Sequence, residues 1–213
     1  MTKISFVYFD VGGVAIKDFS DTPKWDIMIS QLGLDKYDRS QVDLVYSTRD
    51  NDICLGKIHV DELVSLYNTQ FDARIDPQFS LLNYFVDNFE VNTNLWPIID
   101  KLQLTTKTGL LTDMYIGMLD KILAKKLIPN TNWHTIVDSS VEGVRKPMPE
   151  IYALAAERAG VPADEILFID NRQKNLDGAK LAGWQTYLYD SRDYDQANKD
   201  LLDYLQTTAM IKI

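Results

Sequence analysis

The sequence predicts an α/β fold in which a doubly wound parallel sheet carries an inserted all-helical segment. Three observations lead to this prediction. A short apolar run near the N-terminus ends in an aspartate and two glycines, which is typical of a strand buried on both faces. Between about residues 21 and 89, apolar residues recur at helical spacing. Beyond that block, short apolar runs alternate with helical patterns, as they do in parallel sheets with crossover helices.

The first predicted strand covers residues 4–9 and leads directly into Asp10. Open α/β sheets bind their ligands at the carboxyl edge, and this is where the strand would deliver the carboxylate. Gly12 and Gly13 allow a tight turn, and we expect the turn to bring backbone N–H groups close to an anion. An ordinary polar turn would leave the same pattern, so residues further along the chain must decide.

The helical block is expected to form a lobe of its own. Gly33, Gly56 and Pro77 interrupt its apolar pattern, and we predict no strand within it. A lobe inserted over a catalytic edge usually serves as a lid. We therefore predict a core domain of residues 1–16 and 91–213 and a helical cap domain of residues 17–90.

The second part of the chain completes the predicted sheet. Further strands are expected over residues 108–112, 133–137, 165–169 and 184–189. Helices are expected over residues 95–104, 114–127, 150–159, 175–182 and 200–206. Pro149 starts the third of these helices and Gly160 ends it, which is the usual placement of the two residue types.

Composition limits the classes of partner. The net charge of −9 argues against nucleic acid and anionic membranes, because both require clustered Lys and Arg. The single cysteine, Cys54, excludes an internal disulfide and fits a reducing compartment. No apolar run approaches the roughly 18 residues of a membrane span, and the N-terminus lacks the pattern of a signal peptide. We therefore expect a cytoplasmic protein, and its oligomeric state stays open.

Polar side chains stand at the ends of several predicted strands. Asp10 ends the first strand, Thr112 the second, and the pair Asp170-Asn171 follows a later one, while Lys146 precedes Pro147 in a loop. The ends of parallel strands share one edge, so we expect these side chains to converge. Carboxylate, hydroxyl and ammonium groups are the parts needed for phosphoryl transfer through an aspartyl intermediate.

The order of these motifs closely resembles the haloacid dehalogenase-like (HAD) hydrolase superfamily, in its branch with a helical cap after the first strand. The matching segments are Phe9-Asp10-Val11-Gly12-Gly13-Val14, Leu110-Leu111-Thr112-Asp113, Ser139 to Tyr152 with Lys146-Pro147, and Ile166 to Arg172 with Asn175. The resemblance covers nearly the whole chain.

The resemblance implies a set of site residues. Asp10 would be the nucleophile, and Thr112 and Lys146 would bind phosphate. Gly12 and Gly13 would lie at the substrate, and so would Asp113, to which we assign no chemical role. Asp10, the Gly12 carbonyl, and Asp170 or Asn171 would hold Mg²⁺.

Two positions depart from the family pattern. Gly12 stands where most phosphatases of this family carry a second Asp, the acid–base group for the leaving group and the attacking water. Losing such a group costs about 10²- to 10⁴-fold in rate. Some family branches similar to this one, including sugar-phosphate phosphatases, also have Gly there. Asn171 stands where the metal-binding Asp is often found, and an amide brings no charge to the cation. Asp18 is a candidate for the missing proton relay, although a solvated loop carboxylate is the simpler interpretation.

We therefore predict a Mg²⁺-dependent phosphatase of a small phosphorylated metabolite, such as a sugar phosphate. The alternative is a catalytically weakened relative that binds a phosphorylated ligand or a protein partner, because Gly12 and Asn171 occur together. Attack on carbon is disfavoured, since dehalogenases usually have a Tyr at the position of Gly12 and need no metal site.

Overall fold

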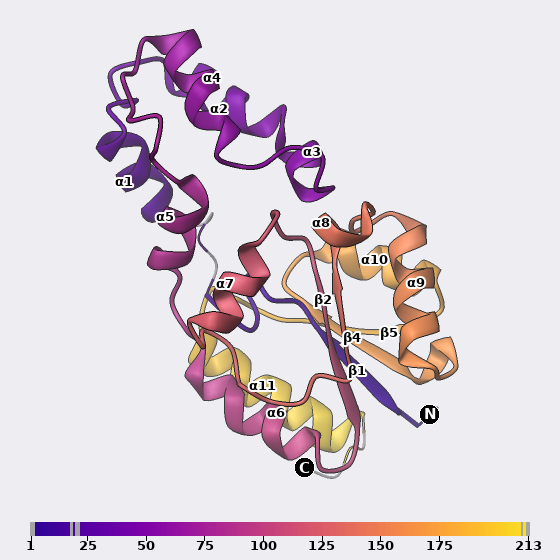
Figure 1. The fold of residues 1–213 in the computed structure, drawn as a ribbon. Coiled ribbons are helices and arrows are strands. Elements are labelled where there is room, and N and C mark those ends of the chain that lie inside the picture. Colours follow the sequence, from indigo (N-terminus) through magenta and orange to yellow (C-terminus); the bar gives the residue numbers. More distant parts are fainter. Residues whose placement is uncertain (1–2, 18, 20–21, 210, 212–213) are drawn as a thin grey trace.

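Five parallel strands form one sheet in the order β3-β2-β1-β4-β5 (Figure 1). The computed structural model describes residues 3–17, 19, 22–209 and 211. The strands are β1 (Phe6–Phe9), β2 (Lys107–Thr112), β3 (Thr135–Asp138), β4 (Ile166–Asp170) and β5 (Gln185–Leu188). The central strand β1 pairs with β2 on one side and with β4 on the other. From β1 the chain builds the sheet outward first through β2 and β3 and then, in the opposite direction, through β4 and β5, so the carboxyl end of β1 is a topological switch point. Ligands of open α/β sheets bind at such a switch point.

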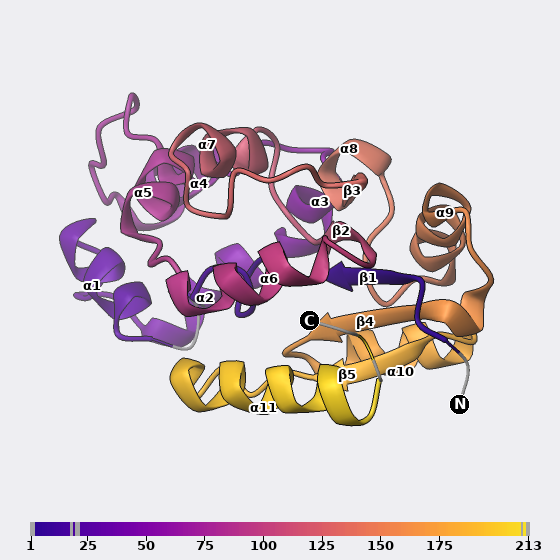
Figure 2. The same cartoon turned by 90° about the horizontal axis from the view of Figure 1, so that it is seen from below.

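Alternate residues of β1 face two different apolar layers, as expected for a strand buried on both sides. Val7 and Phe9 belong to a cluster that includes α6 (Trp96–Leu102) and α11 (Tyr194–Thr207). Phe6 and Tyr8 face α9 (Pro149–Ala159) and α10 (Gln173–Leu181) on the other side (Figure 2). The fold is therefore a three-layer α/β arrangement, and the predicted fold class is confirmed.

The inserted segment is helical throughout its regular structure, and Figure 1 shows its helices beyond the carboxyl ends of the strands. Its helices are α1 (Lys24–Gln31), α2 (Arg39–Ser47), α3 (Asp50–Cys54), α4 (Glu62–Phe71) and α5 (Leu81–Asn88). We call residues 17–90 the cap segment; that they form a separate domain stays a prediction. The two connections to the sheet run side by side, because the Lys17 N–H donates to the Glu90 carbonyl at 2.8 Å.

Several helices differ from their predicted bounds for local reasons. Helix α7 (Met118–Ala124) starts later than predicted, because Gly117 adopts a left-handed φ of 74° directly before it. Helix α11 starts earlier, because the Asp193 side chain caps it by accepting from the Gln196 N–H. The short helix α8 (Ser139–Glu142) was not predicted, nor were the 3₁₀ turns Thr93–Leu95 and Ala163–Glu165. None of the helices in the described ranges is long and apolar enough to cross a membrane.

Candidate active site

Asp10 directly follows β1 and is held by the turn that comes after it. Its Oδ1 accepts from the Val11 N–H at 2.7 Å, and the carboxylate is only 6% exposed. The turn is closed by the Gly13 N–H, which donates to the Ile16 carbonyl, and by the Ile16 N–H, which donates to the Val11 carbonyl, both at 2.9 Å. The Gly13 N–H is thus used within the turn. The expectation that it binds an anion is not supported.

The two glycines have different local roles. Gly13 has a φ of 81°, and a Cβ there would lie 2.1 Å from Nδ2 of Asn171, so only glycine fits. Gly12 has no such requirement, since a Cβ there would meet no heavy atom within 4 Å. Gly12 also lines the cavity described below, and its carbonyl has no backbone partner among the described residues. Gly13 is therefore structural, whereas Gly12 faces the ligand space.

Lys146 joins two buried carboxylates at the edge of the sheet. Its Nζ lies 2.9 Å from Oδ1 of Asp10 and 2.8 Å from Oδ2 of Asp170. The ammonium also donates to the Leu111 carbonyl at 3.1 Å. All three ionisable side chains are buried. The sequence predicted that Asp10, Thr112, Lys146 and the Asp170-Asn171 pair converge on one edge, and this geometry agrees with it for Asp10, Lys146 and Asp170.

The three charges perturb one another. Burial opposes the ammonium of Lys146, but Asp10 and Asp170 outweigh it and hold the pKa of Lys146 above its ordinary value. Burial raises the pKa of Asp10 to about 8, Lys146 opposes this rise, and the carboxylate of Asp170 adds to it.

Asp170 behaves differently, although it shares the same lysine. Burial alone would raise its pKa, but Lys146 and the hydrogen bonds from Asn175 and from the Arg172 N–H hold it below its ordinary value. These bonds are short, at 2.9 Å from Asn175 Nδ2 and 2.7 Å from the Arg172 N–H. Lys146 and these hydrogen bonds therefore favour the ionised form of Asp170, whereas burial favours the protonated form of Asp10.

Thr112 ends β2, next to the end of β1. Its side chain is fully buried, and its Oγ1 has no hydrogen-bond partner among the described residues. An unpaired buried hydroxyl is uncommon, because it forfeits a bond that water would supply. Thr112 is not among the residues lining the cavity, so the hydroxyl lies behind its surface.

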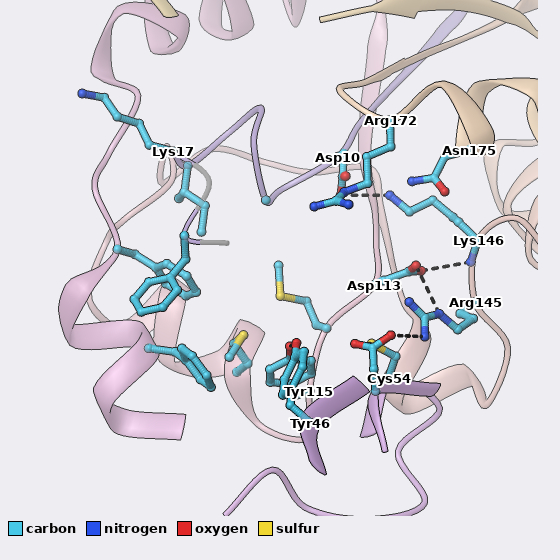
Figure 3. Close-up of a pocket in the computed structure, with 18 of the residues that line it drawn as sticks. Asp10, Lys17, Tyr46, Cys54, Asp113, Tyr115, Arg145, Lys146, Arg172 and Asn175 are labelled. Atoms are coloured by element: carbon cyan, nitrogen blue, oxygen red, sulfur yellow. Dashed lines mark hydrogen bonds and ion pairs between the residues drawn. The ribbon is translucent and has the colours of Figure 1, made fainter. Parts of the chain in front are cut away.

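A second group of charges links the cap segment to the sheet edge. Arg145 contacts Oδ2 of Asp50 in α3 at 2.9 Å and Oδ2 of Asp113 at 3.5 Å (Figure 3). The other oxygen of Asp113 accepts from the Lys146 N–H at 3.0 Å. Ser139 reinforces the junction by donating to the Cys54 carbonyl at 2.7 Å. Asp113 therefore positions the backbone of the Lys146 loop.

A cavity of about 400 Å³ lies between the cap segment and the sheet edge. This volume is within the usual range for small-molecule sites, roughly 300–1,000 Å³. Its polar end contains more cationic than acidic residues, although the whole chain carries a net charge of −9. The cationic residues are Arg145, Lys146, Arg172 and Lys174, and the acidic ones are Asp10, Asp50 and Asp113. Lys17 lies away from them and pairs with Glu90 at 3.3 Å (Figure 3). The cavity therefore favours an anionic ligand.

The residues predicted to hold Mg²⁺ supply the hard oxygen donors that this ion prefers, but of their two carboxylates Asp10 lines the cavity and Asp170 does not. Both polar contacts of Asp10 among the described residues use Oδ1, which leaves Oδ2 for a ligand. The carbonyl of Gly12 is a second donor. Asp170 is committed to Lys146, Asn175 and the Arg172 N–H, and it does not line the cavity. No cluster of three or more His, Cys, Asp or Glu side chains suited to a metal occurs within the described ranges. Asp10 and the Gly12 carbonyl are therefore the two predicted oxygen donors that line the cavity, and the part of Asp170 or Asn171 in holding Mg²⁺ stays a prediction.

The structure adds residues to which the sequence gave no role. Arg145 stands next to Lys146 in the predicted motif, and Asn175 follows the Asp170-Asn171 pair in another, so both carried a signal. The aromatic residues of the cap segment gave no such signal, because their helical spacing is that of ordinary core residues. Asp50 gave none either, because it belongs to no motif in the sequence. Asp18 lies outside the described residues.

These features place a buried carboxylate, paired with a lysine, at the switch point of an α/β sheet. A family model described as haloacid dehalogenase-like hydrolase matches residues 30–183. The chain belongs to this family. The matched range includes Thr112, Lys146 and Asp170, and it starts after the Asp10 turn.

The relatives agree with this assignment. A phosphatase from Mycobacterium tuberculosis is 33% identical over 88 residues, and the match covers 39% of this chain and 39% of that protein. A HAD family enzyme from Bacteroides thetaiotaomicron has a similar fold, with a TM-score of 0.77, 18% identity, and coverage of 90% of this chain and 96% of that one. An L-2-haloacid dehalogenase is also similar, with a TM-score of 0.65, 17% identity, and coverage of 97% and 100%.

Proposed function

We propose that the protein is a Mg²⁺-dependent phosphatase of a small phosphomonoester, with Asp10 as the nucleophile. The observation that carries the proposal is the contact of Asp10 with Lys146 at the mouth of a cavity that favours anions. Support comes from the M. tuberculosis phosphatase and from the B. thetaiotaomicron enzyme, of which an Asp-to-Ala mutant has been solved with magnesium and inorganic phosphate.

In this mechanism Oδ2 of Asp10 attacks phosphorus, and the bond from phosphorus to the leaving oxygen breaks. The ammonium of Lys146 stabilises the charge on the non-bridging oxygens. The leaving oxygen takes its proton from water, since Gly12 offers none. Water then attacks the phosphorus of the aspartyl-phosphate, which releases inorganic phosphate and restores Asp10.

Asp10 can attack only when it is ionised, and its raised pKa opposes this at neutral pH. Lys146 contributes by favouring the carboxylate form. Mg²⁺, when bound by Asp10, the Gly12 carbonyl and the amide of Asn171 or the carboxylate of Asp170, would supply further positive charge for the carboxylate and the phosphate.

The test is turnover of a panel of phosphomonoesters with and without Mg²⁺, comparing wild type with Asp10→Asn. We expect turnover that needs Mg²⁺ and falls by at least 10³-fold in the variant. Activity that survives the substitution would refute Asp10 as the nucleophile.

A weakly catalytic, ligand-binding relative is the second candidate. The observation that favours it is the commitment of Asp170 to Lys146 and Asn175, which leaves Asp10 as the one predicted acidic ligand, among the residues that the structure describes, for a metal at the Lys146 site. Tight binding of a phosphate ester with no turnover in any divalent metal would support this candidate. Turnover of about 1–10³ s⁻¹, the ordinary range of enzymes, would exclude it.

A further inference from the structure

The cavity has two chemically different ends. The Asp10 and Lys146 end is charged, whereas the opposite end is enclosed by aromatic side chains from the cap segment and the loop after β2. We call these residues the aromatic wall: Phe19, Trp25, Tyr46, Phe85, Phe89 and Tyr115. Figure 3 shows Tyr46 and Tyr115 together, away from Lys146 and Asp10. Ile16, Met114 and Met118 add further apolar surface.

The wall is one continuous surface, because each ring contacts another. The Phe85 ring lies 5.1 Å from that of Phe19, 6.4 Å from that of Trp25 and 6.1 Å from that of Tyr115. Trp25 also contacts Tyr46 at 4.9 Å, and Phe19 contacts Phe89 at 6.2 Å. Rings at these distances support one another's orientation. They therefore present a shaped face to the cavity.

The polar atoms of the wall are already used within the protein. Nε1 of Trp25 donates to Oδ1 of Asp43 at 3.0 Å. The hydroxyl groups of Tyr46 and Tyr115 bond to each other. A sugar at this end would have to bury several hydroxyl groups against ring faces and against indole and phenol groups that already bond within the protein, which is unfavourable. An aromatic ring would gain the contacts and lose little hydration.

We infer that the substrate carries an aromatic or similarly apolar group, which packs on the aromatic wall while its phosphate lies at Asp10 and Lys146. This inference rests on the proposed function for the position of the phosphate. It departs from the sugar phosphate given as an example of the predicted substrate. Phe19, Trp25, Phe85 and Phe89 are then the specificity-determining residues.

Binding of non-hydrolysable phosphonates tests the inference without relying on turnover. By calorimetry in Mg²⁺, 3-phenylpropylphosphonate should bind at least about tenfold more tightly than both propylphosphonate and the phosphonate isostere of glucose 6-phosphate. Equal affinities, or tighter binding of the sugar isostere, would overturn the inference.

A pair of matched variants assigns the effect to the wall. Phe89→Leu removes a half-buried ring that lines the cavity, and Phe79→Leu removes a half-buried ring elsewhere in the cap segment. We expect Phe89→Leu, and likewise Trp25→Leu, to weaken phenylpropylphosphonate by about three- to tenfold and to leave propylphosphonate unchanged. Phe79→Leu should change neither. Equal losses in Phe89→Leu and Phe79→Leu would overturn the inference.

Kinetics distinguish this inference from the proposed function. 2-Phenylethyl phosphate and glucose 6-phosphate both release primary alcohols, so a difference in kcat/KM reports on the wall and not on the leaving group. We expect a preference of at least about tenfold for the phenylethyl ester. Turnover without this preference refutes the aromatic subsite alone. Selective phosphonate binding without any turnover refutes the phosphatase and keeps the subsite.

Discussion

Substituting Gly12 by Asp tests how the site handles protons. The structure removes the main obstacle to this experiment, because Gly12 has no left-handed φ and a Cβ there would meet nothing within 4 Å. The new side chain would enter the cavity that Asp10 also lines. It would stand where most phosphatases of the family carry their acid–base Asp.

The expected gain depends on the leaving group. A positioned general acid or base contributes about 10²- to 10⁴-fold in rate when the reaction needs one. An alkoxide needs a proton as its bond to phosphorus breaks, whereas p-nitrophenolate leaves as a stable anion. We expect Gly12→Asp to raise kcat for 2-phenylethyl phosphate by about 10²-fold and kcat for p-nitrophenyl phosphate by about tenfold or less. The pKa of Asp10 is already raised to about 8, and a further carboxylate raises it more, so the gain should require saturating Mg²⁺.

The assay is steady-state turnover of both esters over a range of Mg²⁺ concentrations, with folding checked by thermal denaturation. Gly13→Ala is the matched control. A Cβ at position 13 would lie 2.1 Å from Nδ2 of Asn171 and would strain a φ of 81°, so this variant should be strongly destabilised. A folded Gly12→Asp protein with equal gain, or no gain, on both esters would refute the reasoning. No gain would mean that another group already transfers the proton, and an equal gain would assign the effect to hydrolysis of the aspartyl-phosphate that both esters share.

Three further predictions concern charge. In the metal-free protein, the raised pKa of Asp10 stabilises the fold below about pH 4, and this stabilisation is lost as the pH rises to about 8. Urea denaturation should therefore show that the free energy of unfolding falls by an amount on the order of a few kcal/mol over this range. The fall should be absent in Asp10→Asn. Lys146→Met leaves Asp10 and Asp170 buried without their cation, so it should lower the free energy of unfolding by about 3–5 kcal/mol at pH 8 and by less at pH 5. An equal loss at both pH values would contradict the assignment of Asp10 as the carboxylate with the raised pKa. Arg145→Gln breaks the contact with Asp50 and should speed protease cleavage within the cap segment, whereas Arg158→Gln, which breaks an ion pair with Glu142 outside that segment, should not.

The sequence was sufficient for the parts of the fold that depend on short-range pattern. All five strands were predicted, since each is a short apolar run whose neighbours are turn residues or helices. The carboxyl-edge position of Asp10 and Asp170 followed from the same rule. The convergence of Lys146 on both carboxylates followed from the family motif, because spacing alone does not show where a loop lysine points.

Other features depend on contacts between distant segments and could not be predicted in this way. The hydrogen bond that occupies the Gly13 N–H depends on the return of the chain at Ile16. The contact of Arg145 with Asp50 depends on how α3 meets the sheet edge. Phe85 and Trp25 have helical spacing in the sequence, and only the packing of the cap segment shows that these rings line a cavity.

The glycine at position 12 and the aromatic wall are consistent with one kind of substrate. In a phosphate ester of a phenol, the leaving group is a stabilised phenolate anion, so this ester needs no acid at position 12. The same ester has the ring that the wall would bind. A sugar phosphate, in contrast, would need both the missing proton donor and free hydrogen-bonding groups where Trp25, Tyr46 and Tyr115 have already used theirs. For an aryl ester, the glycine at position 12 therefore removes no acid that the first step requires. The base for the attacking water is missing for every substrate, so hydrolysis of the aspartyl-phosphate should be the slower step for such an ester.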